Sequence, residues 1–308
     1  WGHSLEQFER RWKAFGWHAM VVDGHDLDAI LAAFDDARST KGRPTMILAR
    51  TLKGKGVSLF EGQEGWHGKA LKPGDDLNAA IAELEVQLVE GAVSPPIAAP
   101  LDGPVESMSP PDVSGMPAPA YELGAQVATR TAYGHALAAL GALDQRVVAL
   151  DADVKNSTFS ETFEKAHSDR FYQTYIAEQV MVGAAMGLAS RGAIPFPSTF
   201  ACFLSRAYDF IRMAGISNLN LKLAGSHAGV SIGEDGPSQM ALEDLAMMRA
   251  VPNCAVLYPC DGVSAERLVA AAAAHQGMVY IRTSRPKTSV IYPPSEQFEI
   301  GGSKTLRE

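Results

Sequence analysis

Two stretches of alternating apolar strands and helices, separated by a proline-rich segment, constrain the fold of this chain more than any other feature. Eight of the 18 prolines lie between residues 91 and 120, among Ala, Ser and Gly and without an apolar period. Because proline lacks a backbone donor and fixes φ, this composition predicts an extended linker. We place the linker at 93–120, a first domain at 1–92 and a second at 121–290.

The apolar strands of both stretches are continuous runs, not runs that alternate with polar residues. In the first stretch, strands predicted at 19–22 and 45–49 flank a helix that Asp26 can cap. The inner face expected for that helix is apolar: Leu27, Ile30, Leu31 and Phe34. Six strands are predicted in the second stretch, at 146–150, 172–176, 194–196, 221–224, 255–258 and 278–281. This pattern is typical of parallel sheets covered on both faces, so we expect two doubly wound α/β domains with ligands at the loops that follow strands.

Charge and cysteine content exclude several classes of function. The net charge is -8, and no block of Lys and Arg offers a track for a nucleic-acid backbone or an anionic membrane. The three cysteines, Cys202, Cys254 and Cys260, have no CxxC spacing, which disfavours a zinc site or a disulfide framework. Apolar runs are shorter than a membrane span. We therefore expect a cytoplasmic protein without nucleic-acid or membrane partners.

Several loop segments are distinctive in order and spacing. They are 53–56 (KGKG), 65–69 (GWHGK), 129–134, 151–159 (DADVKNSTF), 175–179 (YIAEQ), 198–200 (STF), 225–227 (GSH), 233–239 (GEDGPSQ) and 282–286 (RTSRP). Together they resemble the transketolase family, and its animal-type branch in particular. The resemblance covers essentially the whole chain.

The resemblance implies a thiamine diphosphate-binding fold with three α/β domains. Residues 1–92 resemble the C-terminal part of the diphosphate-binding domain, which makes the first domain incomplete, and 121–290 resemble the pyrimidine-binding domain. Residues 291–308 would begin a linker to a C-terminal domain that is absent. No Gly-Asp-Gly metal motif occurs in the sequence. The implied cofactors are thus thiamine diphosphate and Mg²⁺ (or Ca²⁺) held by residues outside this chain, with no metal ligand within it.

Glu178 is the expected catalytic residue. In the family, a glutamate after this strand hydrogen-bonds a ring nitrogen of the cofactor's pyrimidine. Phe200 and Phe203 resemble the aromatic residues that clasp that ring and bind the cofactor. Without the resemblance, Glu178 would be read as a first-turn glutamate favoured by the helix dipole, and the two phenylalanines as core. Arg206 lies near this clasp, and no chemistry is assigned to it.

Substrate binding is expected from residues of five loops. By resemblance, His227 contacts the sugar hydroxyls or phosphate region and also acts in catalysis, while Asp235 contacts the hydroxyl that sets acceptor stereochemistry. Asp235 could equally be an Asp-Gly turn former. Gln239 stands where many microbial relatives carry His; it cannot titrate, but it can hydrogen-bond a substrate hydroxyl. Three further residues match positions that bind the sugar phosphate: Arg130, Ser157 and Arg285.

In the first domain, Lys53 and His67 resemble residues close to the cofactor diphosphate and the donor's terminal hydroxyl. His67 is accordingly also a catalytic candidate. From the residues alone, His67 could be a packed loop histidine and Lys53 a solubilising charge.

The expected function is that of a transketolase: transfer of a two-carbon ketol unit from a ketose phosphate to an aldose phosphate in the pentose phosphate pathway. The expected partners are sugar phosphates and a second copy, because the active site of the family lies between the subunits of a homodimer. Alone, the chain would lack a complete active site. Two alternatives stay open: a deoxyxylulose phosphate synthase or 2-oxoacid dehydrogenase component, and an inactive fragment or partner-binding subunit.

Overall fold

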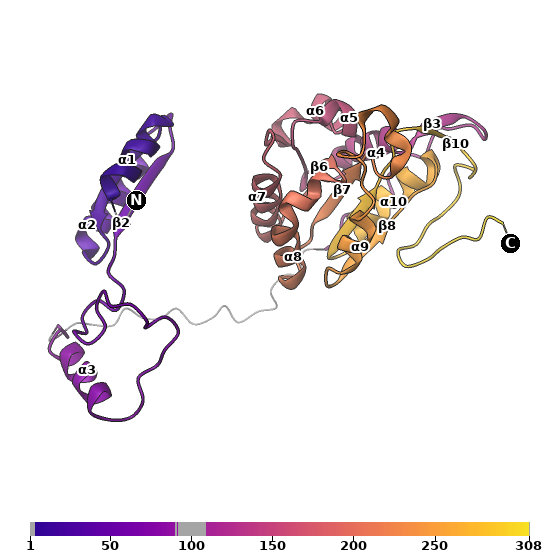
Figure 1. Cartoon of the computed structure of the whole chain (residues 1–308). Coiled ribbons are helices and arrows are strands. Elements are labelled where there is room, and N and C mark those ends of the chain that lie inside the picture. The colour runs from indigo at the N-terminus through magenta and orange to yellow at the C-terminus, as the bar shows by residue number, and fades with distance from the viewer. Residues whose placement is uncertain (1–3, 90, 92–108, 308) are drawn as a thin grey trace. The chain divides into compact units, whose positions relative to one another are not determined.

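The computed structural model describes residues 4–89, 91 and 109–307. The chain divides into two compact units, Trp1–Leu101 and Asp102–Glu308 (Figure 1). The predicted linker lies partly outside the described residues, at 93–108. From 109 to 120 the chain lies along the second unit, where Val113 and Met116 pack against its core.

The first unit is built around two parallel strands. Its elements are α1 (Leu5–Ala14), β1 (His18–Asp23), α2 (Leu27–Ser39), β2 (Thr45–Arg50) and α3 (Asp75–Glu85). β1 and β2 pair in parallel, with His18 opposite Thr45. The Asp26 side chain accepts hydrogen bonds from the first turn of α2, as its sequence position predicts.

The apolar face of α2 differs from the prediction. Leu27, Leu31 and Phe34 were expected to face inward, but all three are exposed, and Ala33 is the buried residue of the helix. A sheet of two strands presents too narrow a face to cover a helix of this width.

The second unit contains the remaining elements. They are β3 (Gln126–Ala128), α4 (Thr129–Leu143), β4 (Val147–Asp151), α5 (Lys155–Thr158), α6 (Glu161–Ala166), η1 (Ser168–Arg170), β5 (Phe171–Gln173), α7 (Glu178–Ser190), β6 (Ile194–Phe200), η2 (Phe203–Ala207), α8 (Tyr208–Ile216), β7 (Lys222–Ser226), η3 (Val230–Asp235), α9 (Asp244–Arg249), β8 (Cys254–Leu257), α10 (Gly262–Ala274), β9 (Met278–Arg282) and β10 (Lys287–Ser289).

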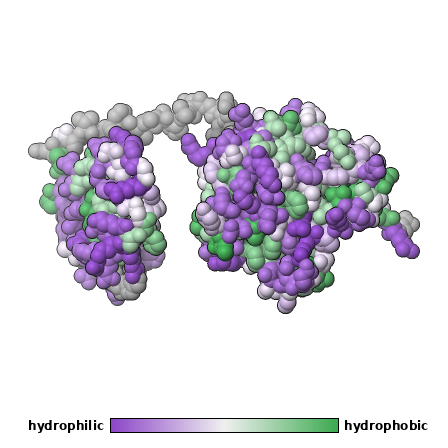
Figure 2. Space-filling model, turned by 90° about the horizontal axis from the view of Figure 1, so that it is seen from above, coloured by the Kyte–Doolittle hydropathy of each residue, from purple (hydrophilic) through white to green (hydrophobic). Residues whose placement is uncertain are grey.

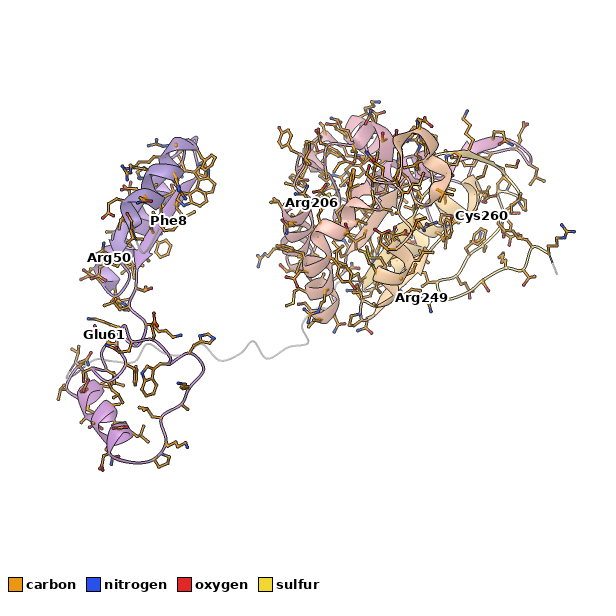
Figure 3. The ribbon with its side chains drawn as sticks, in the orientation of Figure 1. Phe8, Arg50, Glu61, Arg206, Arg249 and Cys260 are labelled. Carbon is orange, nitrogen blue, oxygen red and sulfur yellow. The ribbon has the colours of Figure 1, made fainter. Side chains whose placement is uncertain are left out.

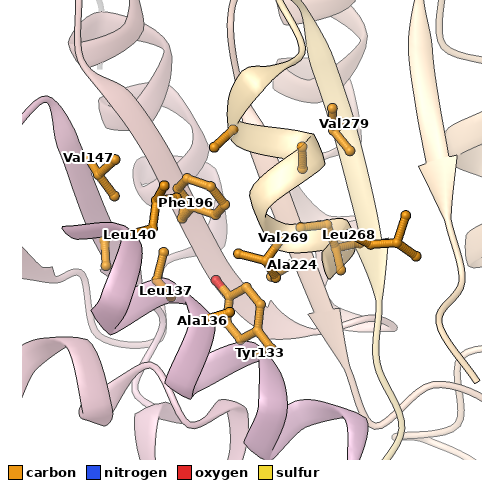
Figure 4. Packing of buried hydrophobic residues seen from close by; sticks show 14 of the residues in the cluster. Tyr133, Ala136, Leu137, Leu140, Val147, Phe196, Ala224, Leu268, Val269 and Val279 are labelled. Carbon is orange, nitrogen blue, oxygen red and sulfur yellow. The ribbon is translucent and has the colours of Figure 1, made fainter. Parts of the chain in front are cut away.

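Six of these strands form one parallel sheet in the order β5-β4-β6-β7-β9-β8, and β3 and β10 form a separate antiparallel pair. Helices cover both faces of the sheet. One core lies on the α4 and α10 side, where Leu137, Phe196 and Val269 pack together (Figure 4). The other contains residues of α7 and α8, such as Val182 and Ile211. The predicted parallel α/β fold is thus confirmed.

The chain reverses direction across the sheet at β4. Its neighbours β5 and β6 lie on opposite sides of it, so the connections that follow β4 and β5 run in opposite directions. In open α/β sheets, ligands bind at such a point, outside the carboxyl ends of the strands. The surface around the units is largely hydrophilic with scattered hydrophobic residues (Figure 2).

Candidate active site

The carboxyl ends of the parallel strands carry most of the predicted site residues. β6 ends at Phe200, His227 follows β7, and Arg285 lies three residues beyond β9. Arg130 is near the start of α4, and Glu178 is the first residue of α7. Segments that are far apart in sequence thus contribute to one edge of the sheet.

Glu178 is buried, with a side chain only 3% exposed. Its Oε2 lies 3.3 Å from Nη1 of Arg206, whose side chain is 58% exposed. Arg206 lies on η2, on the side of the unit where α7 runs (Figures 1 and 3). The contact is an ion pair without hydrogen-bond geometry, and Oε2 has no hydrogen-bond partner within the described residues. A buried carboxylate oxygen with free acceptor capacity is suited to receive a donor from a ligand.

Three rings stack beside the sheet edge. The ring centroids of Phe200 and Phe203 lie 5.1 Å apart at 8°, and those of Phe200 and His227 lie 3.9 Å apart at 14°. Phe200 and Phe203 also belong to a small apolar cluster with Ala228 and Ala241. The structure therefore brings both predicted aromatic residues together with the predicted histidine. The two phenylalanine rings provide flat apolar surfaces at the site.

His227 is buried and adopts a positive φ of 59°. Its Nδ1 lies 2.9 Å from Oγ of Ser226, and its Nε2 lies 3.4 Å from Nη1 of Arg130. Burial, together with the positive charges of Arg130 and Arg285, lowers the pKa of His227 to about 4. At neutral pH the imidazole is uncharged, so it can donate or accept a hydrogen bond without carrying a charge.

Besides its contact with His227, Arg130 hydrogen-bonds the loop that carries Ser157. Its Nη1 donates to the carbonyl oxygen of Ser157 at 2.8 Å, and its guanidinium lies 5.2 Å from the ring centre of Phe159. Its Nε is buried and has no hydrogen-bond partner in the described part of the chain. Burial and the charge of Arg285 lower the pKa of Arg130. The expected pair of Arg130 and Ser157 is adjacent, although the contact uses the serine carbonyl and not its hydroxyl.

Arg285 is engaged by the loop that contains η3. Its Nη1 donates to the carbonyl of Ile232 and to Oδ2 of Asp235, both at 3.0 Å, and its Nη2 donates to Oε1 of Glu234 at 2.7 Å. Gln239, further along the same loop, accepts a hydrogen bond from Ser238. Two predicted substrate-binding residues, Arg285 and Asp235, are therefore bound to each other.

Lys53 and His67 lie in the first unit, on the loops between β2 and α3. Nζ of Lys53 lies 3.0 Å from Nδ1 of His67, and both residues are exposed. The structure thus brings this predicted pair into contact across 14 residues of sequence.

Two residues to which the sequence assigned no role stand out. Arg206 is the ion-pair partner of Glu178, and Asp151 is fully buried at the carboxyl end of β4. Asp151 accepts hydrogen bonds from Val154 N, Thr158 Oγ1 and Ser160 Oγ, and burial raises its pKa to about 6. It organises the loop that carries Ser157. The sequence feature that could have identified Asp151 is its position at the start of the DADVKNSTF segment, at the end of a predicted buried strand.

Within residues 4–89, 91 and 109–307, no group of three or more His, Cys, Asp or Glu side chains could hold a metal ion. Over the same residues, no helix has the length and apolar character needed to cross a membrane.

Known relatives resemble the chain over almost its whole length. It is 50% identical to transketolase-like protein 2 of Mus musculus and 48% identical to transketolase of Homo sapiens, in each case over 99% of this chain and 48% of the relative. Transketolase-like protein 1 of Bos taurus is 49% identical over 99% of this chain and 51% of its own length. The chain therefore spans about half the length of these curated relatives.

Solved structures give the same fold. A transketolase from Campylobacter jejuni matches with a TM-score of 0.72 and 21% identity, over 95% of this chain and 50% of that one. A split gene transketolase, described as an inactive beta4 tetramer, matches with a TM-score of 0.54 and 42% identity over 60% of each chain.

Two family models match the two units. The model "Transketolase, thiamine diphosphate binding domain" matches residues 2–87. The model "Transketolase, pyrimidine binding domain" matches residues 125–290, which is more than half of the chain. On these matches, the chain belongs to the transketolase family.

Proposed function

We propose that this chain is the pyrimidine-binding domain and the end of the diphosphate-binding domain of a thiamine diphosphate-dependent transketolase. The reaction is the transfer of a two-carbon ketol unit from a ketose phosphate to an aldose phosphate, in the pentose phosphate pathway. The observation that carries the proposal is the buried Glu178 carboxylate, whose Oε2 accepts no hydrogen bond from any residue that the structure describes. Relatives that are transketolases or transketolase-like proteins favour this activity over a deoxyxylulose phosphate synthase or a 2-oxoacid dehydrogenase.

The residues at the site fit the pyrimidine part of the cofactor. Glu178 would hold a proton at a ring nitrogen, and this contact would use the acceptor that the protein leaves free. The faces of Phe200 and Phe203 would bury the flat ring without requiring hydrogen bonds. When bound, the cofactor supplies the carbanion stabilisation that ketol transfer requires.

Phosphate binding is proposed for Arg130, Arg285 and Ser157, and contacts with sugar hydroxyls for His227, Asp235 and Gln239. The Nε of Arg130 supports this: it has no hydrogen-bond partner over the described ranges, and a substrate oxygen would supply one. A phosphate dianion at Arg285 would have to displace the carboxylates of Glu234 and Asp235. The neutral imidazole of His227 suits a catalytic contact with a sugar hydroxyl.

For the first unit, we propose that Lys53 and His67 lie near the cofactor diphosphate and the donor's terminal hydroxyl. Their mutual contact supports a shared place in one site. A Mg²⁺ or Ca²⁺ ion would be held by residues that this chain does not contain. A cytoplasmic location is part of the same proposal.

The assembly proposed is a homodimer with the active site between subunits. Support comes from an exposed apolar face around α7 and α8 that a second copy could cover: Tyr175, Ile176, Val180, Phe210 and Met213. Because the chain spans about half of its relatives, we propose that it lacks a complete active site when isolated.

Product analysis tests the proposal. The complete enzyme that carries this segment is incubated with thiamine diphosphate and Mg²⁺, and with either xylulose 5-phosphate and ribose 5-phosphate or pyruvate and glyceraldehyde 3-phosphate. We expect ketol transfer from xylulose 5-phosphate and no product from pyruvate. Product from pyruvate alone would overturn the assignment in favour of a synthase or dehydrogenase.

A further inference from the structure

The charge partner of Glu178 is a residue outside the predicted site. Among the described residues, the ion pair formed by the Glu178 carboxylate is with Arg206, 3.3 Å away. A carboxylate that is 3% exposed loses most of its hydration and needs a compensating charge. Arg206 supplies this charge from the protein surface, because more than half of its own side chain remains in water.

The geometry of this pair leaves the carboxylate free to accept a hydrogen bond. Oε2 is buried and has no hydrogen-bond partner among the described residues, even though the guanidinium nitrogen is within ion-pair distance. A bidentate Arg–carboxylate pair would instead occupy the acceptor positions. Arg206 therefore provides charge without occupying the hydrogen-bonding capacity of Glu178.

Arg206 lies close to Phe200 and Phe203, the residues proposed to bind the pyrimidine ring, because it follows them directly in the chain. It lies on η2, three residues after Phe203, and η2 packs against α7. Thr199, near the end of β6, also has a buried hydroxyl, and no residue described by the structure forms a hydrogen bond with it. The neighbouring Ser198 hydroxyl pairs with Tyr133 of α4, so Thr199 points to the opposite face of the sheet, against which α7 packs. Two polar atoms that lack a hydrogen-bond partner among the described residues, Oε2 of Glu178 and Oγ1 of Thr199, thus lie on the α7 side of the sheet.

We propose that Arg206 is a positioning residue: its guanidinium orients the Glu178 carboxylate and compensates its charge, while Oε2 stays available to accept a hydrogen bond from the N–H of a bound aminopyrimidine. The inference rests on the proposed function and adds a residue to it. The positive charge of Arg206 would also repel a cationic ligand. The side chain of Arg206 is 58% exposed, so water screens its charge, whereas its attraction to Glu178 acts on a buried atom at 3.3 Å; we therefore expect the attraction to dominate.

The test uses the ¹⁵N-labelled complete enzyme that carries this segment, with thiamine, the cofactor without its diphosphate, as the probe. Thiamine binding is followed by the amide signals of Glu178 and Phe203, and the ring nitrogen of ¹⁵N-labelled thiamine reports its hydrogen bonding directly. The variants are Arg206→Met, Arg206→Lys and Glu178→Gln. The matched control is Arg212→Met, which removes a similarly exposed arginine that pairs with Asp209 on α8.

We expect Arg206→Met to weaken thiamine binding about three- to fivefold, as loss of a partly exposed ion pair allows, and to shift the ring-nitrogen signal. Arg206→Lys should restore both, and Arg212→Met should change neither. If Arg206→Met binds like wild type while Glu178→Gln does not, this inference is wrong and the proposed function stands. A lysine variant as weak as the methionine variant also contradicts it. If thiamine leaves the Glu178 and Phe203 signals of the wild type unchanged, both proposals are overturned.

Discussion

Arg285 and Asp235, two residues expected to bind substrate, form an ion pair with each other at 3.0 Å. Glu234 completes the cluster with a second contact to the same guanidinium at 2.7 Å. The loop after β7 and the loop after β9 are thereby joined across the carboxyl edge of the sheet. An incoming phosphate and these two carboxylates would compete for one cation.

The first prediction follows from that competition. Arg285→Ala in the complete enzyme should raise KM for phosphorylated sugars about tenfold and leave kcat nearly unchanged, because the loss is of charge-assisted bonds to the substrate's tail. Glu234→Gln, which removes a competing charge, should lower KM. Steady-state kinetics with phosphorylated and non-phosphorylated donors makes the measurement. Arg249→Ala, on the exposed end of α9, is the control. Equal losses with both donor types would contradict the phosphate role.

The second prediction concerns Glu178. Replacing it with alanine in the complete enzyme should reduce kcat at least about a hundredfold, since a positioned proton-transfer group contributes that much. The fold should survive, because Oε2 of this carboxylate accepts no hydrogen bond within the part of the chain that the structure describes. Turnover and thermal unfolding are measured on the same preparation, with Glu164→Ala as the control for removing a glutamate that pairs with Lys155. Near-normal turnover in the Glu178 variant would refute its catalytic role.

The strands of the two parallel sheets could be predicted from the sequence, because buried parallel strands are continuous apolar runs, but the short antiparallel pair of β3 and β10 could not. The extent of β6 could not be predicted either. Pro195 and Pro197 lie within it, opposite Val148 and Leu150 of β4, and prolines in a central strand normally argue against one. The strand nevertheless includes both prolines and continues to Phe200, beyond the predicted end at 196. The domain boundaries at 92 and 121 stay predictions.

Contacts between side chains of different loops could not be predicted from the periodicity of the sequence. Periodicity places Glu178 at the start of a helix, but the approach of Arg206 depends on the turn that η2 makes after β6. The predicted strand at 172–176 also extended too far. β5 ends at Gln173, and Tyr175 has a φ of 55° in the loop that leads to α7. An apolar Tyr-Ile pair reads as strand, although both residues are exposed.

The third prediction tests the buried ion pair between Arg282 and Asp244. Arg282 Nε lies 2.8 Å from Oδ2 of Asp244, which also accepts a hydrogen bond from Tyr280 at 2.7 Å. Asp244→Ala should lower the free energy of unfolding by about 3–5 kcal/mol, because it leaves a buried guanidinium without its counter-charge. Urea denaturation measures the change. Glu243→Ala, at the exposed neighbouring position, should cost well under about 1 kcal/mol. Similar effects of the two substitutions would show that the pair is not what stabilises this region.

The fourth prediction concerns Lys222, a fully buried lysine in β7. Its Nζ donates to the carbonyl oxygens of His275 and Gly277, and it has no carboxylate partner among the described residues. Burial lowers the pKa of Lys222 to about 7. Between pH 7 and the ordinary lysine pKa, the unfolded chain therefore binds more protons than the folded one, so stability should rise with pH across this window. Below pH 7, both states carry the charge and the contribution is constant.

Lys222→Met should remove this dependence. The difference in unfolding free energy between wild type and variant should change by up to about 2 kcal/mol from pH 7 to pH 9, in favour of the wild type as pH rises. The two carbonyl oxygens that lose their donor add an offset that does not vary with pH, so the slope and not the absolute difference is diagnostic. Lys287→Met, an exposed lysine in β10, provides the control and should show no slope. A flat difference for Lys222→Met would mean that the amine stays charged in the folded protein, and that the two carbonyls alone compensate its burial.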